Sequence, residues 1–367
     1  MNENHRLIEE LKKSPLFNMS LSSKELFHSN FIAWVSETYP LKFGKLLSDY
    51  FVEKNKFVST EIKCVHRESR NLDLIIEFES SKLIIENKVK SVPDRQQLID
   101  YKNKSNPNDL FVLLTLIRPP FDTTEIGWEI LTYRDLGVIL DNLKNLLSDN
   151  DSYNKSLLND YVFFINNLTC ITESLKFDTE TDCYNFYNSD YGIYKEIRLH
   201  DLYIKYKYTQ LVSEIHSFLQ SKRENIEVLK GTRYSHENHK NKIVISFNFV
   251  NGKGVINIDY SNENEIIYGI MLDGIRYNHY LYAWGKKEKE KKNIANNLRQ
   301  KKLWFSFDFI PENESYPKKG KDFNKFGNSM IYRSAKIKSS TTIKELLNRI
   351  NTDTIRLQNI KTNANKV

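Results

Sequence analysis

Two apolar segments close together in the sequence, residues 72–78 and 83–89, most constrain the fold of this chain. Both are rich in Leu and Ile, and the short polar sequence between them predicts a β-hairpin. Each segment nevertheless contains charged residues, with Asp73 near the start of the first and Glu86 and Lys88 near the end of the second. A hairpin places the start of one strand opposite the end of the next, so we expect these three side chains to lie close together.

Such a cluster has a chemical meaning. Two neighbouring carboxylates repel each other unless a proton or a cation lies between them, and a hard divalent cation such as Mg²⁺ prefers oxygen ligands of this kind. An ammonium group beside the cation can orient a water or stabilise the charge that develops on a phosphate during attack. The alternative is a buried ion-pair network with a structural role only. Because burying three ionisable groups in apolar strands is costly, Asp73, Glu86 and Lys88 are better explained by catalysis of phosphodiester hydrolysis.

The order of these residues resembles that of the PD-(D/E)XK nuclease superfamily. Residues 72–74 are Leu-Asp-Leu, residues 85–88 are Ile-Glu-Asn-Lys, and residues 97–101 are Gln-Leu-Ile-Asp-Tyr. Together with residues 25–34, Glu-Leu-Phe-His-Ser-Asn-Phe-Ile-Ala-Trp, they resemble a bacterial branch whose motifs are Leu-Asp-Leu, Ile-Glu-Asn-Lys and Gln-Leu-x-x-Tyr. Leu72 stands where the name of the superfamily has proline, which is often absent there.

The resemblance covers roughly the first 170 residues and is silent about the rest. It implies an α/β fold of the restriction-endonuclease type, in which helices flank a mixed sheet. It also implies that Asp73, Glu86 and the main-chain carbonyl of Asn87 bind Mg²⁺, for which Mn²⁺ is a substitute.

Further residues receive roles from the same resemblance. Lys88 would position or activate the attacking water, and Glu25 would lend another carboxylate, unless it only complements the dipole at a helix start. Gln97 and Tyr101, four residues apart on one face of a helix expected over 95–104, would hold water or phosphate. The alternative for this pair is an ordinary surface helix. His28 either contacts phosphate or satisfies a buried hydrogen bond.

Length and charge suggest two domains. At 367 residues the chain can form more than one core, and the apolar pattern breaks between residues 177 and 190. We therefore expect a nuclease-like domain over 1–175 and a basic α+β domain over 190–367. Residues 1–174 hold 21 Lys and Arg against 25 Asp and Glu, and the remainder holds 33 against 22, or a net +11. This excess suits a domain that binds nucleic acid or another partner, or else a solvated basic surface.

Two segments of the second half combine aromatic and basic residues. Tyrosines and lysines are interleaved over 203–208, where they either stack on nucleobases or cover a core with their apolar parts. Residues 286–302 hold eight Lys and Arg against two Glu and lead directly into Trp304-Phe305. By composition this segment is the best nucleic-acid patch, although charged runs are commonly solvated surface.

The sequence also predicts the cellular setting. No apolar run approaches the ~20 residues that a membrane helix needs, and residues 1–20 lack the basic start and apolar core of a signal peptide. We therefore expect a cytoplasmic protein with no membrane partner. Cys64, Cys170 and Cys183 are too few and too scattered for a zinc site or a disulfide framework.

These observations predict a metal-dependent nuclease that hydrolyses DNA, with defence against phage as a setting that such bacterial nucleases suggest. One alternative is a non-catalytic nucleic-acid-binding module on a nuclease scaffold, against which the intact Asp73, Glu86 and Lys88 argue. Another is a hydrolase of RNA or nucleotides, which would have the same metal site. The oligomeric state is left open, a homodimer included.

Overall fold

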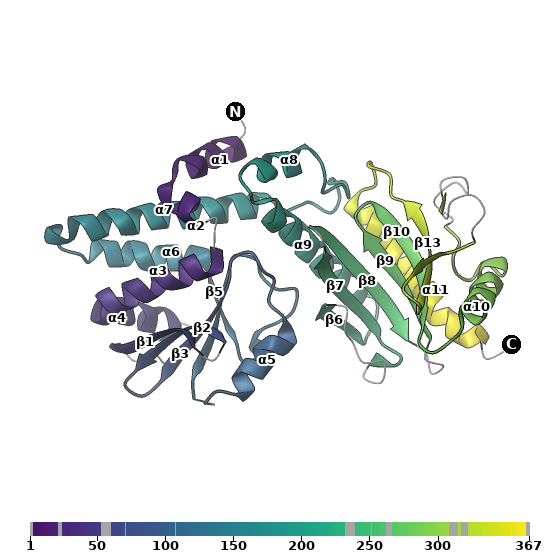
Figure 1. Ribbon diagram of the computed structural model, residues 1–367, viewed down its shortest axis with the longest axis horizontal. Coiled ribbons are helices and arrows are strands. Elements are labelled where there is room, and N and C mark those ends of the chain that lie inside the picture. The colour runs from purple at the N-terminus through teal and green to yellow at the C-terminus, as the bar shows by residue number, and fades with distance from the viewer. Residues whose placement is uncertain are drawn as a thin grey trace. The chain divides into compact units, whose positions relative to one another are not determined.

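A computed structural model describes residues 3–20, 24–52, 60–69, 71–106, 108–231, 239–250, 252–261, 266–307, 315–316 and 322–364 (Figure 1). Contacts group the chain into two compact units, residues 1–176 with 193–206, and residues 177–192 with 207–367. The helices and strands in chain order are α1 (Glu3–Lys13), α2 (Pro15–Ser20), α3 (Lys24–Thr38), α4 (Pro40–Val52), β1 (Ile62–Ser69), β2 (Leu72–Phe78), β3 (Lys82–Lys88), α5 (Arg95–Asn103), β4 (Leu110–Thr115), η1 (Thr124–Ile126), β5 (Glu129–Thr132), α6 (Tyr133–Asn145), η2 (Asp149–Asp151), α7 (Ser152–Ser174), α8 (Ser189–Glu196), α9 (His200–Gln220), β6 (Ile226–Lys230), β7 (Ile243–Val250), β8 (Lys253–Ser261), β9 (Ile266–Asp273), β10 (Arg276–Ala283), α10 (Glu288–Gln300), β11 (Ser315–Tyr316), β12 (Asn324–Phe326), β13 (Met330–Lys336) and α11 (Ile343–Ala364).

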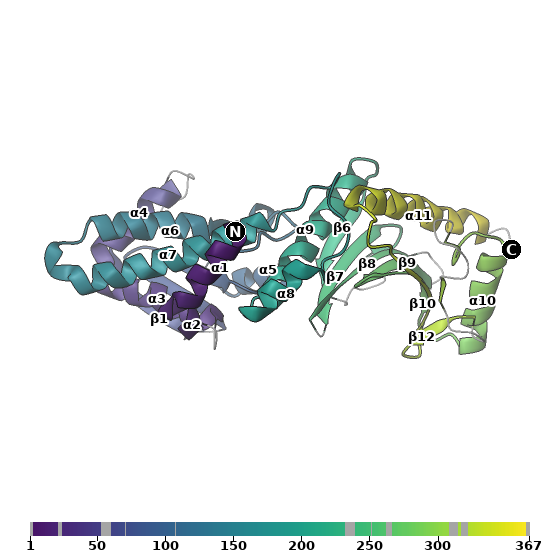
Figure 2. The same cartoon turned by 90° about the horizontal axis from the view of Figure 1, so that it is seen from above.

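The first unit is built around a mixed five-stranded sheet with the strand order β1-β2-β3-β4-β5. The first three strands are antiparallel, and β4 and β5 run parallel to β3. Helix α3 packs against β1, β2 and β3, and α6 packs against α7 (Figures 1 and 2). Helix α5 contributes Leu98 to an apolar cluster with Ile84, Phe111 and Trp128. The expected fold class, a mixed sheet flanked by helices, is confirmed.

Strands β2 and β3 form the hairpin that the sequence predicts, with Leu74 opposite Ile85. Both strands consist largely of buried Leu and Ile, which holds the hairpin inside the unit. The regular strand pairing ends at these two residues, and beyond them the Asp73 carboxylate accepts a hydrogen bond of 2.7 Å from the Asn87 N–H. The charged residues therefore lie where the strand ladder opens.

The second unit contains a sheet with the strand order β11-β13-β10-β9-β8-β7-β6, in which β12 also pairs with β13. One face of this sheet carries two helices. On it, Tyr208 of α9 lies over Gly254 of β8, where an added Cβ would meet the ring at 2.2 Å. On the same face, Tyr277 of β10 donates a hydrogen bond to Asp353 of α11, which lies along the sheet (Figure 2). This second sheet confirms the expected α+β architecture of the C-terminal part.

Two further expectations can be compared with the structure. Tyr203 and Tyr208 are each only 1% exposed, so the interleaved segment of α9 covers cores with its tyrosines. None of the helices in the described part of the chain has both the length and the apolar character needed to cross a bilayer. The two functional domains and the cytoplasmic location stay predictions.

Candidate active site

Asp73, Glu86 and Lys88 lie together at the open end of the β2–β3 hairpin, and we refer to them as the charged cluster. Lys88 Nζ is 2.6 Å from Glu86 Oε1, so both side chains lie on one face of β3, as strand alternation predicts. The Asp73 carboxylate reaches the main-chain N–H of Asn87, the residue between them. The side chains of Glu86 and Lys88 are only 3% and 12% exposed. The structure therefore brings together the three residues that the sequence singles out.

Burial controls the electrostatics of this cluster. Burial outweighs the opposing charge of Lys88 and, with the nearby Asp73 carboxylate, raises the pKa of Glu86 to about 7. Burial likewise raises the pKa of Asp73, although the hydrogen bond from Asn87 acts in the other direction. Burial alone would lower the pKa of Lys88, but the Glu86 carboxylate holds that pKa above its usual value. Two carboxyl groups thus share a site that disfavours their joint ionisation.

The donor atoms of the cluster fit a divalent cation. Glu86 Oε1 is paired with Lys88, whereas Glu86 Oε2 is buried and has no hydrogen-bond partner in the described part of the chain. A buried oxygen of this kind is costly unless a cation or a donor approaches it. No three His, Cys, Asp or Glu side chains among the described residues form a metal-binding group. Asp73 and Glu86 are the two carboxylates of the cluster, so a cation held by them would take its other oxygens from main chain or water, as is common for Mg²⁺.

Glu25, in the first turn of α3, lies near the charged cluster but its carboxylate has another partner. Its Oε1 accepts hydrogen bonds from Ser91 Oγ at 2.5 Å and from the Ser91 N–H at 3.1 Å. Its charge still contributes to the raised pKa values of Asp73 and Glu86. No motif in the sequence indicated Ser91, which belongs to the loop after β3.

Asn87 points to the opposite face of β3 and is 1% exposed. Its amide nitrogen donates to the Glu25 carbonyl at 2.9 Å and to Ser29 Oγ at 3.0 Å. Its amide oxygen accepts a hydrogen bond of 2.7 Å from the Tyr133 hydroxyl. The side chain thus joins the end of β3 to the starts of α3 and α6. For the predicted metal ligation this leaves the main-chain carbonyl of Asn87.

Gln97 and Tyr101 lie on one face of α5, as their spacing predicts. Gln97 Nε2 donates to the Tyr101 hydroxyl at 2.7 Å. The helix is positioned by its N-cap, Asp94, and by the Trp128 indole, which donates to the main chain of α5. Burial raises the pKa of Tyr101, and the Glu86 charge contributes to the same shift. Tyr101 is therefore near enough to the charged cluster to feel its charge.

His28 takes the second of the two roles considered for it. It is 1% exposed, and its Nδ1 lies 2.7 Å from the Tyr161 hydroxyl. Its ring packs edge to face against Tyr133, the residue that binds Asn87. The structure therefore favours a buried hydrogen bond over a contact with phosphate.

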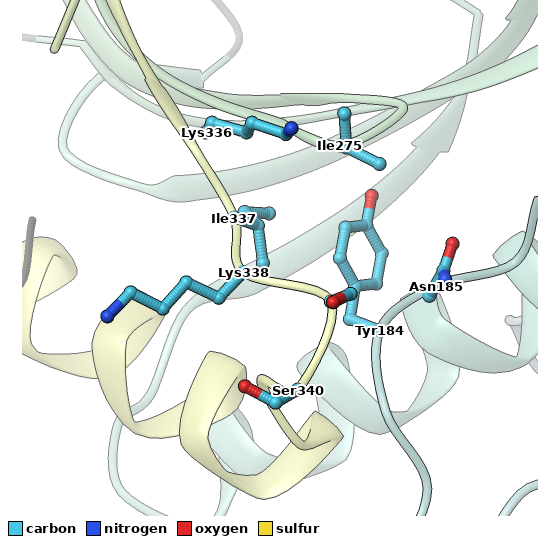
Figure 3. Close-up of a pocket in the computed structure, with 8 residues that line it drawn as sticks. Tyr184, Asn185, Ile275, Lys336, Ile337, Lys338 and Ser340 are labelled. Carbon is cyan, nitrogen blue, oxygen red and sulfur yellow. The ribbon is translucent and has the colours of Figure 1, made fainter. Parts of the chain in front are cut away.

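A pocket of about 530 Å³ lies in the second unit, where the end of β13 leads toward α11 (Figure 3). Lys336, Lys338, Tyr184 and Ser340 are among the eight residues that line it. None of the eight carries a carboxylate, an imidazole or a thiol. This pocket therefore provides none of the acidic groups that the predicted chemistry requires.

The raised pKa of Glu86 predicts how stability depends on pH in the metal-free protein. Between about pH 5 and pH 7 the folded chain holds a proton that the unfolded chain, with a carboxyl pKa of 4.5, has released. The free energy of unfolding should therefore decrease as the pH rises through this range, by at most about 3 kcal/mol. Denaturant titrations in EDTA at about pH 5.5 and pH 7.5 should show a smaller decrease for Glu86→Gln than for the wild type. Equal decreases would show that Glu86 is not the group that holds this proton.

The three hydrogen bonds of the Asn87 side chain predict a large cost for Asn87→Ala. The change leaves the buried Tyr133 hydroxyl, Ser29 hydroxyl and Glu25 carbonyl without this partner, and we expect a loss of about 2–4 kcal/mol in unfolding free energy. Tyr133→Phe removes one of the three bonds and should cost about 1 kcal/mol. Urea denaturation measures both values. An Asn87→Ala variant as stable as Tyr133→Phe would show that this network does not join β3 to α3.

Comparisons with known proteins agree with the architecture of the first unit. Residues 16–162, about 40% of the chain, match the family model described as the PD-(D/E)XK nuclease superfamily. The matched segment contains the charged cluster, α3 and α5, and it supports a nuclease. No curated protein and no solved structure matched the chain. The likeness to the bacterial branch stays a prediction, whereas residues 16–162 are similar in sequence to the PD-(D/E)XK nuclease superfamily.

Proposed function

We propose that this chain is a metal-dependent nuclease that hydrolyses DNA phosphodiester bonds. The observation that carries the proposal is the buried Glu86 Oε2, which lacks a hydrogen-bond partner in the described structure and lies in a cluster with Asp73 and Lys88. Replacing buried ionic groups by apolar residues is often neutral or stabilising, so a cluster of this kind is better explained by chemistry than by stability. The match of residues 16–162 to a nuclease family supports the reaction class.

Asp73 and Glu86 would hold the metal ion, Mg²⁺ or its substitute Mn²⁺, together with the main-chain carbonyl of Asn87. When bound, such an ion polarises a phosphoryl oxygen and lowers the pKa of a water molecule. Lys88 is nearly buried and is paired with Glu86, so its ammonium group would orient the attacking water and stabilise negative charge on the phosphate. Its role would be to donate hydrogen bonds rather than to remove a proton.

The remaining residues would act around this centre. The Tyr101 hydroxyl accepts a hydrogen bond from Gln97 and can donate its own proton to a phosphate oxygen or a water. Gln97 would thereby hold the phenol in a fixed orientation. Glu25, bound to Ser91, would add negative charge beside the metal and favour its binding. Each role depends on α3 and α5 being fixed on the sheet. The Asn87 hydrogen bonds hold α3 to β3, and the Trp128 hydrogen bond and the packing of Leu98 against Ile84 hold α5.

DNA is the substrate that we propose, because the basic second half offers charge for a long polyanion. Defence against phage, which depends on the resemblance alone, and a cytoplasmic location, which depends on the lack of a long apolar run in the sequence, complete the proposal. RNA is the second candidate substrate, since the same metal centre would hydrolyse it.

Cleavage assays test the proposal directly. Purified protein with Mg²⁺ or Mn²⁺ should cut circular or linear DNA, and EDTA should abolish cutting. Asp73→Asn, Glu86→Gln and Lys88→Ala should each lower the rate by at least about 100-fold, because each removes charge from the centre of the reaction. Asp100→Asn, which changes an exposed carboxylate of α5, is the matched control and should keep full activity.

Two results would contradict the proposal. Metal-dependent cutting that persists in a folded Glu86→Gln variant would place the chemistry elsewhere in the chain. Cutting of RNA without cutting of DNA would show that the substrate is RNA, while the proposed metal centre would still stand.

A further inference from the structure

Two aromatic side chains of the second unit are strongly exposed. Trp284, directly after β10, is 74% exposed, and Phe326 of β12 is 75% exposed. In the described part of this unit no other large hydrophobic side chain is more than half exposed. Tyr282 lies two residues before Trp284, and the centroids of their rings are 6.4 Å apart. We call Trp284, Tyr282 and Phe326 the aromatic row.

Strand register places the aromatic row on one face of the sheet. Tyr282 of β10 and Phe326 of β12 both lie directly opposite Met330 of β13, one on each side of that strand. Side chains directly opposite each other in antiparallel strands point to the same face. Tyr277 and its hydrogen bond to α11 mark the other face, because Tyr277 lies five positions before Tyr282 along β10 and an odd offset along a strand changes the face. Tyr282 and Phe326 therefore lie on the face that α11 does not cover, and the ring of Trp284 lies beside that of Tyr282.

A buried lysine fixes the segments that carry these rings. Lys291 of α10 is 2% exposed and donates hydrogen bonds to the carbonyl oxygens of Lys286, at 2.9 Å, and Asn328. Lys286 lies two residues after Trp284, and Asn328 lies two residues after Phe326. The two ring-bearing segments are thus held together before any ligand arrives. Preorganisation of this kind reduces the conformational entropy that the protein loses when it binds a ligand.

Several lysine side chains follow Trp284 in the sequence. Three lysines after Trp284 form no ion pair with the acidic residues of the described structure: Lys286, Lys287 and Lys289. The acidic Glu288 is already paired with Lys292 and Lys325, and Glu290 is the other acidic residue of α10. The surface near Trp284 therefore combines exposed rings with an excess of positive charge.

The structure corrects the patch that composition suggested. Trp304 and Phe305, which follow the basic segment in the sequence, are both 0% exposed. Trp304 stacks on the buried His279, with ring centroids 3.9 Å apart. These two rings belong to the core, and the exposed rings near the basic segment are those of the aromatic row.

We propose that the aromatic row and its neighbouring lysines bind a single-stranded segment of DNA. Exposed aromatic rings stack on the faces of bases that are not engaged in a duplex, and lysines neutralise the phosphates between them. The choice of DNA over RNA rests on the proposed nuclease function. The surface itself is formed by the second unit and does not use the charged cluster.

Fluorescence anisotropy with a labelled oligothymidine tests this assignment on the full-length protein. The titration is made in EDTA, so metal-dependent cleavage does not enter, and binding can succeed even where cleavage assays fail. The combined variant Trp284→Ala/Phe326→Ala should bind at least about tenfold more weakly, because each ring provides stacking free energy. Tyr153→Ala, which removes a ring that is 78% exposed in the first unit, should bind like the wild type.

A second measurement separates stacking from a general loss of structure. Of the four tryptophans, Trp128 and Trp304 are 0% exposed, Trp34 of the first unit is partly buried, and Trp284 is 74% exposed, so stacking on Trp284 should dominate quenching of tryptophan fluorescence by the oligonucleotide. Trp284→Phe should keep most of the affinity and lose most of the quenching. Lys286→Ala/Lys287→Ala should lower the slope of log affinity against log salt by about 0.7 for each phosphate contact removed.

The proposal is overturned by any of three results. The first is an unchanged affinity of the Trp284→Ala/Phe326→Ala variant for single-stranded DNA. The second is equal or tighter binding of wild-type protein to a duplex of the same length or to the matching RNA. The third is a variant that changes the oligomeric state in sedimentation velocity but not DNA binding, which would assign the row to a contact between two copies of this chain.

Discussion

The candidate site of the first unit depends on the burial of like charges at the open end of a hairpin. Glu86 lies beside Asp73 among the buried Ile and Leu residues of β2 and β3, where water cannot screen their repulsion. Lys88 compensates part of that charge, but it contacts only one of the two Glu86 oxygens. When both carboxylates are ionised the cluster lacks one positive charge, which a proton on Glu86 or a divalent cation would supply.

The two faces of β3 contribute to this site in different ways. The face of Glu86 and Lys88 presents the groups to which we assign the chemistry, and α5 brings Tyr101, bound to Gln97, near enough to feel their charge. On the opposite face, the three hydrogen bonds of the Asn87 side chain fix α3 and α6 to β3. Asn87, between Glu86 and Lys88, can do this because successive side chains of a strand point in opposite directions.

Much of this arrangement could be predicted from the sequence, since it depends on local patterns. The two apolar runs and the short polar turn between them determine the hairpin, and the hairpin determines that Asp73 meets Glu86 and Lys88. The helix expected over 95–104 is α5, which begins at Arg95 and has Asp94 as its N-cap. Other contacts join residues far apart in sequence, such as Tyr133 with Asn87 and Ser91 with Glu25. No local pattern signals such pairs, because only the packing of α3 and α6 on the sheet brings them together.

Burial of aromatic residues was the hardest feature to predict. Trp284 and Trp304 both border the basic segment 286–302, yet one is 74% exposed and the other is 0% exposed. Composition alone predicts the same exposure for Trp284 and Trp304. Strand register and the stacking of Trp304 on His279 decide which of the two rings reaches solvent. The same holds for the interleaved tyrosines and lysines of α9. Composition left open whether these tyrosines stack on bases, whereas Tyr203 and Tyr208 are buried.

The most direct test of the proposed metal centre is to locate a bound metal ion. Crystals grown with Mn²⁺ allow its position to be found from anomalous scattering. We expect one strong peak in contact with carboxylate oxygens of both Asp73 and Glu86, and no such peak in Glu86→Gln crystals. A peak that contacts neither carboxylate, in crystals of protein that cleaves DNA, would contradict the assignment of the metal centre.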